Sequence, residues 1–337
     1  MSETSVLQVN GLKTSFFMDK SEVPAVDDID FNLKQGEIIA IVGESGCGKS
    51  VTSLSIMGLV PHPPGKVVGG EIIFNDENIL KASESKMRDI RGNEIAMIFQ
   101  EPMTSLNPLF TIGNQIMEAI LIHRKWNKKQ AEMKAIEYLK LVGLPRAEEL
   151  MNEYPHQLSG GMRQRVMIAM AMVCEPKVLI ADEPTTALDV TIQSQILALM
   201  KRLNKQLNTS IILITHDLGV VSEICERVIV MYAGKIVEET DVKTIFESPQ
   251  HPYTKGLIQS VPDIRDKKSR LYSIPGNVPI PGSIKQGCRF ADRCDFVMDK
   301  CKVETPELVT IETNHKVRCF LHEESEENTY DKNTIRS

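Results

Sequence analysis

The sequence has no apolar run near the roughly 20 residues that a helix needs to cross a bilayer, so we expect no membrane-spanning segment. Residues 1–10 are polar and acidic and lack the positive-then-apolar pattern of a secretory signal, which predicts a cytoplasmic protein. Basic residues are not in surplus, since 39 Lys and Arg face 45 Asp and Glu. This balance disfavours nucleic acid as a partner, because binding phosphates requires a basic face. Any work at a membrane therefore requires a membrane-embedded partner.

The composition is that of a globular chain, long enough for one large domain or two smaller ones. Short apolar runs bounded by polar turns predict buried parallel strands at residues 37–42, 178–181 and 211–214. A helix is expected at 50–59, a strand at 71–74, and a hairpin at 227–239 around Ala233 and Gly234. Residues 102–173 have the spacing of a helical insertion. Residues 274–282 are rich in Pro and Gly and predict an extended linker. Residues 322–337 are polar and acidic and predict disorder.

A glycine-rich stretch follows the first of these strands and matches G-x-x-x-x-G-K-[ST] at every position. Glycines let successive N–H groups point at phosphate oxygens, the lysine reaches the outer phosphates, and the final hydroxyl binds Mg²⁺. The alternative is a chance match in a structural turn, which the expected strand before it and helix after it disfavour. The predicted ATP contacts are Gly43, Glu44, Ser45, Gly46, Cys47, Gly48, Lys49, Ser50 and the next residue, Val51.

Two carboxylates end the apolar run at 178–181. In parallel sheets, ligands bind at the carboxyl ends of strands. Asp182 is therefore placed to hold Mg²⁺, and Glu183 to polarise an attacking water as a general base. The alternative is an acidic pair that is merely solvated.

A third motif lies between these two and names a family. Leu158, Ser159, Gly160, Gly161 and Met162 resemble the LSGGQ signature of ABC ATPases, with Met in place of the final Gln. At a helix N-terminus, the serine hydroxyl and the glycine N–H groups would bind an anion. The alternative is an ordinary turn and helix cap, which the position of the motif between the two others disfavours.

Further elements of that family follow in order. Gln100 resembles the glutamine that touches Mg²⁺ or its water, and Asp189 falls in the segment that resembles the D-loop. His216 resembles the histidine that contacts the γ-phosphate, and Phe16 the aromatic that stacks on adenine, although Phe17 is adjacent. The resemblance thus implies that Lys49, Gln100, Glu183 and His216 are catalytic.

The resemblance implies an α/β fold: a P-loop NTPase (RecA-like) ABC ATPase core with an antiparallel β subdomain, a helical subdomain at about 102–173 and a small Cys-rich C-terminal lobe. The expected nucleotide-binding domain is 1–260, the extension 261–321 and the disordered tail 322–337. The family mechanism is a head-to-tail dimer, in which each ATP lies between the phosphate loop of one subunit and the signature turn of the other.

Three longer stretches are more specific: 98–108, 251–262 and the block from Gly287 to Cys319. They resemble the ATPases of oligopeptide and dipeptide importers, some of which carry nickel or other small solutes. The implied partners are a second, similar ATPase in a heterodimer, two membrane permeases and an extracellular solute-binding protein, with this chain on the cytoplasmic face of the membrane. A soluble ABC ATPase acting on DNA or ribosomes, or a redox sensor, are the other possibilities.

Four cysteines lie in the C-terminal block, at Cys288, Cys294, Cys301 and Cys319, with spacing C-x5-C-x6-C-x17-C. In a reducing cytoplasm such a cluster indicates a metal rather than disulfides. Four thiolates suit Zn²⁺ or a [4Fe–4S] cluster, and the family resemblance favours iron–sulfur. Free thiols in a small lobe are the alternative. Arg289, Arg293 and Lys302 lie among them and are expected to favour thiolates.

Overall fold

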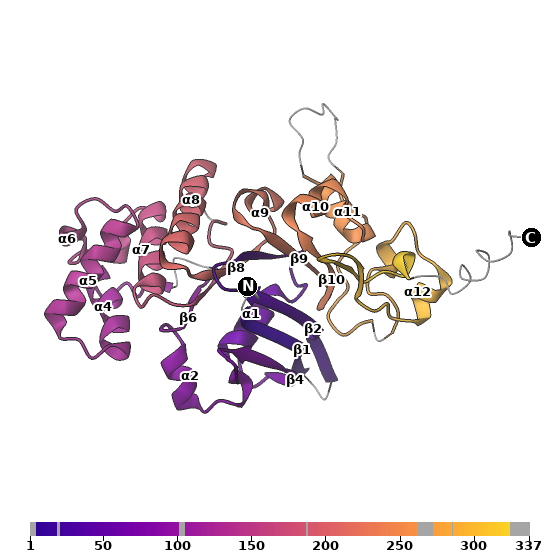
Figure 1. The fold of residues 1–337 in the computed structure, drawn as a ribbon, viewed down its shortest axis with the longest axis horizontal. Coiled ribbons are helices and arrows are strands. Elements are labelled where there is room, and N and C mark those ends of the chain that lie inside the picture. The colour runs from indigo at the N-terminus through magenta and orange to yellow at the C-terminus, as the bar shows by residue number, and fades with distance from the viewer. Residues whose placement is uncertain are drawn as a thin grey trace, which may run out of the picture.

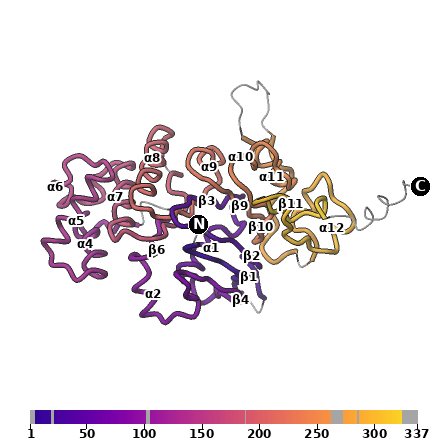
Figure 2. The backbone as a smooth tube through the Cα atoms, in the orientation of Figure 1, coloured from indigo at the N-terminus to yellow at the C-terminus, as the bar shows by residue number. Residues whose placement is uncertain are grey.

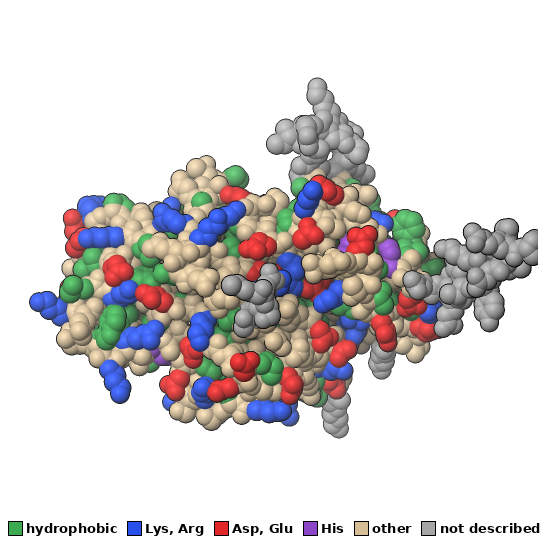
Figure 3. Space-filling view, in the orientation of Figure 1, with side chains coloured by type: hydrophobic (Ala, Val, Ile, Leu, Met, Phe, Trp, Pro, Cys, Tyr) green, Lys and Arg blue, Asp and Glu red, His purple; other side chains and the backbone are tan. Residues whose placement is uncertain are grey.

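The computed structural model describes residues 5–18, 21–100, 105–186, 188–261, 272–284 and 286–323. Two sheets organise these residues, and a group of helices lies at one end (Figure 1). On the face drawn in Figure 3, acidic and basic side chains are interspersed over the described surface.

An eight-stranded sheet in the order β11-β12-β10-β9-β3-β8-β7-β6 forms the centre. Five neighbouring strands are parallel: β9 (Arg227–Tyr232), β3 (Ile38–Val42), β8 (Ser210–Thr215), β7 (Val178–Asp182) and β6 (Ile95–Ile98). β10 (Lys235–Asp241) pairs antiparallel with β9, and then come β12 (His315–Val317) and β11 (Val309–Glu312). The sheet therefore joins a parallel core to an antiparallel edge.

The parallel strands are apolar throughout because both faces of the sheet are covered. Leu179 and Ala181 pack with α7 (Gly160–Met172) and α8 (Val190–Leu207), whereas Ile180 packs with α1 (Lys49–Met57) and the second sheet. α9 (Leu218–Ile224) and α10 (Val242–Glu247) pack near β9. This two-sided burial explains why the strand sequences are continuous apolar runs rather than alternating apolar and polar residues.

The second sheet is antiparallel, in the order β2-β1-β4-β5, and lies below the centre in Figure 1. Its strands are β1 (Ser5–Met18), β2 (Ser21–Lys34), β4 (Gly65–Phe74) and β5 (Glu77–Asn78), followed by η1 (Ile79–Lys81) and α2 (Glu84–Ile90). The predicted strand at 71–74 is thus the end of the longer β4.

The helical subdomain lies at one end of the molecule (Figure 1). It contains α4 (Ile112–His123), α5 (Lys128–Leu141), α6 (Ala147–Leu150), η2 (Pro155–Gln157) and α7. Thr111 caps α4, and Asn127 forms a capping box with Gln130 at the start of α5. The helical insertion predicted for residues 102–173 corresponds to these helices, which run from Ile112 to Met172; residues 102–104 lie outside the described part.

The C-terminal extension packs beside the β10 edge (Figure 2). It follows α11 (Pro252–Gln259) and contains η3 (Ala291–Arg293), α12 (Asp299–Val303), β11, β12 and η4 (Phe320–His322). Through β12 it continues the central sheet, which the sequence did not reveal. His322 ends η4, and the rest of the predicted disordered tail, from residue 324, lies outside the described residues.

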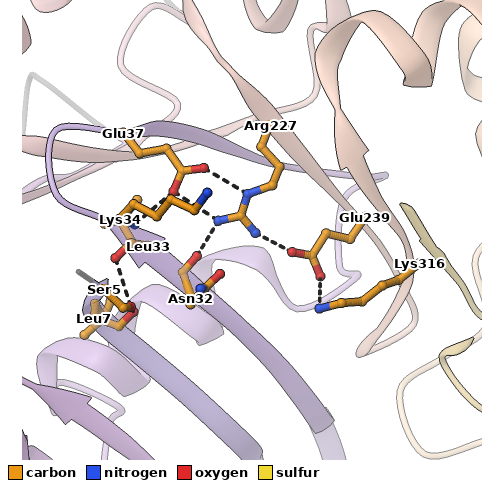
Figure 4. A network of polar contacts seen from close by, with 9 residues as sticks. All are labelled: Ser5, Leu7, Asn32, Leu33, Lys34, Glu37, Arg227, Glu239 and Lys316. Atoms are coloured by element: carbon orange, nitrogen blue, oxygen red, sulfur yellow. Dashed lines mark hydrogen bonds and ion pairs between the residues drawn. The ribbon is translucent and has the colours of Figure 1, made fainter. Parts of the chain in front are cut away.

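A polar network fastens these parts together (Figure 4). The Arg227 guanidinium of β9 contacts Glu37 at 2.9 and 3.1 Å, the Glu239 carboxylate of β10, and the Asn32 carbonyl of β2. Lys316 of β12 adds an ion pair of 3.1 Å to Glu239. One arginine therefore joins both sheets, and the extension joins the same network.

Most sequence expectations for the core are confirmed. The strands expected at 37–42, 178–181 and 211–214 are β3, β7 and β8, and the helix expected at 50–59 is α1. The hairpin at 227–239 is β9 and β10, with Ala233 and Gly234 at positive φ in the turn.

Candidate nucleotide site

The phosphate loop connects β3 to α1, as the motif requires. Gly43 has φ 150, and a Cβ there would lie 2.2 Å from the Met231 carbonyl. Gly48 has φ 106, and its Cβ would lie 2.6 Å from the Ala25 carbonyl. A side chain fits at neither position. Gly48 caps α1 without a side-chain hydrogen bond, which leaves the first N–H groups of the helix available to an anion.

Lys49 has a buried side chain that folds back over the loop. Its Nζ donates to the carbonyl oxygens of Gly43 at 2.7 Å and Glu44 at 3.1 Å. Cys47 is fully buried, and burial raises the pKa of its thiol. A cation is thus held at the loop, beside a protonated thiol that packs as a small apolar group.

A cavity of about 440 Å³ opens beside this loop. Its apolar lining includes the paired residues Phe16 and Val23, and its polar lining includes Gln100 in contact with Glu183, so that we distinguish a polar end and an apolar end. The polar end has Lys49, Ser50, Gln100 and Glu183. The lining from the loop, the antiparallel sheet and the extension comprises Ser45, Gly46, Gly48, Val51, Phe16, Met18, Val23, Ala25, Ile280 and Pro281. An anionic group at one end and a flat apolar group at the other match this shape, as in a nucleoside triphosphate.

Asp182 ends β7 next to this cavity, with 4% of its surface exposed. Burial raises the pKa of the carboxyl, whereas a hydrogen bond with Ser50 opposes that rise. The Oδ1 atom is buried without a hydrogen-bond partner. A buried carboxylate oxygen without a partner, beside a serine hydroxyl, suits the oxygen-ligand preference of Mg²⁺. Asp182 and Ser50 could therefore hold the ion, which would neutralise the charge of bound phosphates.

Glu183 follows at φ 47, a left-handed conformation that is rare for glutamate. Its carboxylate accepts hydrogen bonds from Gln100 Nε2 at 3.1 Å and Thr186 Oγ1 at 2.9 Å, and lies 3.1 Å from His216 Nδ1. Burial would raise the pKa of Glu183, but the bonds from His216 and Thr186 outweigh it and hold the pKa below its usual value. The side chain is therefore ionised at neutral pH and can accept a proton from water.

The signature turn lies apart from this cavity. Ser159 caps α7 by accepting from Met162 N at 3.3 Å, and Leu158 is buried. No residue from 158 to 162 is among the described residues that line the cavity. The turn instead lies beside the start of α8, where a Cβ on Gly161 would meet Ile192 at 3.0 Å. Asp189 caps that helix through Ile192 N.

The structure thus brings together Phe16, the loop residues, Gln100, Asp182, Glu183 and His216, but not the signature. Phe16 lines the cavity, whereas Phe17 is exposed and is not among the lining residues, which favours Phe16 as the adenine contact. Sequence reasoning missed Thr186, as well as Ile280 and Pro281, which it placed in a linker. The apolar residues within that Pro-rich stretch were a sequence signal that it packs against other parts of the protein.

Two residues from beyond the core also contact the phosphate loop. Tyr253 of α11 accepts a hydrogen bond from Glu44 N at 2.9 Å. Arg293 of η3 donates two hydrogen bonds to the Glu44 carboxylate, at 2.7 and 3.1 Å. No sequence signal connects these positions, because they meet only in the folded chain.

The four cysteines of the extension share one lobe. Cys301 is buried and the others are partly buried. The sulfurs of Cys294 and Cys301 accept backbone N–H groups at 3.4 and 3.5 Å. In the part of the chain that the structure describes, however, no group of three or more His, Cys, Asp or Glu side chains is arranged to hold a metal ion. Among these described residues, the structure therefore does not show the expected site for a [4Fe–4S] cluster or Zn²⁺.

The expectation that neighbouring cations favour thiolates in this lobe is wrong. Burial raises the pKa of Cys288 to about 11 and also raises the pKa values of Cys294 and Cys319, and the other thiols add to the rise. Arg289 instead contacts Asp27 and the Ala233 carbonyl, and Arg293 contacts Glu44. The two arginines therefore fasten the lobe to the core rather than pairing with these thiols.

Comparisons with known proteins agree with this geometry. The family model for ABC transporters matches residues 26–186, and that for the oligopeptide/dipeptide transporter C-terminal region matches residues 237–301. An oligopeptide transport ATP-binding protein of Bacillus subtilis, AppD, is 56% identical and covers 95% of this chain and 98% of its own. The chain belongs to the ATP-binding subunits of the ABC transporter family. A dipeptide transport ATP-binding protein of Escherichia coli, DppD, is 48% identical over 94% of this chain and 96% of its own.

Solved structures show the same cassette. The ABC cassette MJ0796, a dimer bound to ADP and phosphate, aligns with a TM-score of 0.63 and 28% identity over 70% of this chain and 98% of its own. CbiO1 from Clostridium perfringens aligns with a TM-score of 0.62 and 30% identity over 73% of this chain and 92% of its own. This ABC ATPase has, among its described residues, no helix long and apolar enough to cross a membrane.

Proposed function

We propose that this ATPase energises the uptake of dipeptides or oligopeptides, at the cytoplasmic face of the cell membrane, as one of two similar ATPase subunits in a heterodimer. Two membrane permeases would carry the solute, and an extracellular solute-binding protein would deliver it. The observation that carries this proposal is the likeness to peptide-transport ATPases over 95% of the chain, which includes the C-terminal region. Import of nickel or another small solute is the alternative within the same family.

The site supports a role for each residue. Lys49 would exchange its carbonyl partners for the outer phosphates, and Ser50 with Asp182 would hold Mg²⁺. Glu183 would orient and deprotonate the attacking water, with Gln100 and His216 placing its carboxylate. Phe16 would contact adenine. The phosphate is attacked without a covalent intermediate, so positioning and charge compensation supply the rate.

The second half of the site would come from the partner ATPase. The residues at 158–162 lie away from the cavity of their own chain, and a turn at the N-terminus of a 13-residue helix offers N–H groups to an anion. In a head-to-tail dimer, each signature turn would close the cavity of the other subunit, with Asp189 nearby. ATP would favour the closed dimer by binding it more tightly than the open one.

A metal on the four thiols remains a separate proposal. Its support is the family resemblance and the placing of all four thiols in one lobe, where two of the sulfurs accept backbone N–H groups; the roles proposed above for the ATP-site residues do not depend on such a metal. Iron and zinc analysis of protein purified without oxygen tests it. About one equivalent or more of iron or zinc per chain, absent from the Cys288→Ser variant, would support a metal bound to the thiols. A metal-free protein with full ATPase activity would refute it.

The test of function replaces the chromosomal copy with Glu183→Gln and measures uptake of labelled dipeptides and oligopeptides, with nickel uptake in parallel. The control is Glu307→Gln, an exposed glutamate outside the site. Loss of peptide uptake in Glu183→Gln alone, with nickel unaffected, supports the proposal. Normal peptide uptake with reduced nickel uptake would show that this ATPase serves a nickel importer of the same family instead. Recovery of the protein with permeases in the membrane fraction separates both from an ABC ATPase that acts in solution.

A further inference from the structure

The apolar end of the nucleotide cavity has walls from two distant parts of the chain. The antiparallel sheet provides Phe16 and Val23, and the C-terminal extension provides Ile280 and Pro281. The two extension residues lie more than 90 positions beyond the carboxylates in the sequence. A segment expected to be a linker therefore reaches the site where ATP would bind.

Local geometry holds this segment against β2. Ser283 N donates to the Ile280 carbonyl at 3.0 Å and closes a turn. Gly282, at φ 80, lies beside the strand, since an added Cβ would be in ordinary van der Waals contact with Pro24 and Val23 at 3.4 Å. Pro281 also restricts the backbone of the residue before it. The turn is thus packed on the strand that provides Val23 to the same cavity.

Ile280 has an exposed side chain despite this packing, with 78% of its surface open to solvent. A single exposed apolar residue is ordinary on a protein surface. This one, however, lines the apolar end of a cavity whose other end has the phosphate loop, Lys49 and the carboxylates. A ligand with a charged end and an apolar end would cover the Ile280 side chain when its charged end reached the loop.

Arg293 fixes the distance between this segment and the phosphate loop. Its Nε donates to the Pro275 carbonyl at 2.8 Å, and its two terminal nitrogens bind the Glu44 carboxylate. The side chain is only 5% exposed. A second arginine, Arg289, contacts Asp27 of β2. The extension is therefore anchored to both the loop and the strand, so its residues at the cavity have a defined position.

We propose that Ile280 and Pro281 bind the adenosine part of ATP together with Phe16, so that the C-terminal extension is a direct part of the nucleotide site. The proposal rests on the cavity being the ATP site. The ligand contacted is the apolar base and ribose, not the phosphates. Because binding and docking stabilise each other reciprocally, ATP holds the extension in place and the extension retains ATP.

Binding measurements with two ligands separate the two ends of the cavity. We would measure the Kd of ATP and of inorganic tripolyphosphate, each with Mg²⁺, for the full-length chain and for Ile280→Ala. Loss of the Ile280 methyl groups that ATP would cover is expected to weaken ATP binding about five- to tenfold, and to leave tripolyphosphate binding within about twofold. Val303→Ala, which removes an exposed apolar side chain from α12, is the matched control and should change neither value.

Hydrogen exchange gives a readout that needs no substitution. ATP should slow exchange of the backbone amides at residues 278–283, and tripolyphosphate should not. Equal ATP affinity of Ile280→Ala and the unmodified chain, or an equal loss for both ligands, would overturn the inference. Lys49→Ala should weaken both ligands; if it weakens neither, the assignment of the cavity itself fails, and the two failures are thereby distinguished.

Discussion

The ion pair between Arg293 and Glu44 allows a quantitative prediction, because the burial of both side chains and the distances between them are defined. Arg293 is 5% exposed and Glu44 31% exposed, so the pair is neither a surface bridge nor a fully buried one. Two charge-assisted hydrogen bonds join them, at 2.7 and 3.1 Å. Exposed pairs contribute about 0–1 kcal/mol, and removing a partner of a buried pair costs about 3–5 kcal/mol. We expect a coupling of about 1–3 kcal/mol between the two side chains.

A double-mutant cycle measures this coupling. The free energy of unfolding is determined by urea denaturation for the unmodified chain, Arg293→Gln, Glu44→Gln and the double variant. The double variant should be less destabilised than the sum of the single variants by the coupling energy. Lys302→Gln is the control: its pair with Asp299 is exposed on both sides, at 63% and 101%, and should contribute at most about 1 kcal/mol.

Nucleotide binding adds a second criterion. Because the pair holds the second residue of the phosphate loop, Arg293→Gln should weaken the binding of both ATP and tripolyphosphate, whereas Ile280→Ala should weaken ATP alone. A coupling below about 0.5 kcal/mol, within the error of additivity, would refute the view that the extension braces the loop. A loss confined to ATP would refute it as well, because it would show that Arg293 acts at the base end.

Three further predictions concern stability. Arg227→Gln should lower the free energy of unfolding by about 3–5 kcal/mol, measured in urea, because it removes the guanidinium partner of Glu37 and Glu239, which are 8% and 5% exposed, and leaves Glu239 only its ion pair with Lys316; a loss below about 1 kcal/mol would contradict this. Gln164→Met should raise the melting temperature, since both polar side-chain atoms of Gln164 are buried without partners and their desolvation costs about 1–3 kcal/mol; a lower melting temperature would show an unrecognised role. Burial lowers the pKa of His251 to about 3, so between pH 6.5 and 3 the unfolded chain binds a proton that the folded chain does not, and stability falls as pH falls. From pH 7 to pH 5 this amounts to about 2 kcal/mol, and His251→Asn should be less sensitive to pH by that amount; an unchanged pH dependence would contradict the burial argument.

The phosphate loop and the carboxylate pair could be predicted because their chemistry is local. Gly43 and Gly48 adopt backbone conformations that only glycine tolerates at such close contact, and Lys49 is fixed by its place at the start of α1. Asp182 and Glu183 end a strand whose apolar run is visible in the sequence. The buried strands themselves were readable because both faces of the sheet are covered, which makes every position apolar.

The family assignment also came from the sequence, since the order of the motifs is retained and each occupies consecutive residues. The signature turn shows the limit of this approach. Its residues could be identified, and Ser159 lies at the N-terminus of a helix as expected. The family resemblance implied that the turn serves the other subunit, and the structure adds that it lies outside the cavity of its own chain. The sequence likewise placed four cysteines in one block, without the distances that decide whether a metal fits.

The sequence by itself thus determined the chemistry of the site, because phosphate binding, metal coordination and water activation depend on residues that are adjacent along the chain or at the ends of recognisable strands. Only the tertiary structure decided what surrounds that chemistry. The pairing of β12 with β10, the Arg293 bond to Glu44 and the position of Ile280 beside Phe16 at the cavity join residues that are 77, 249 and 264 positions apart. No local pattern encodes such contacts, since they arise from the packing of the whole chain.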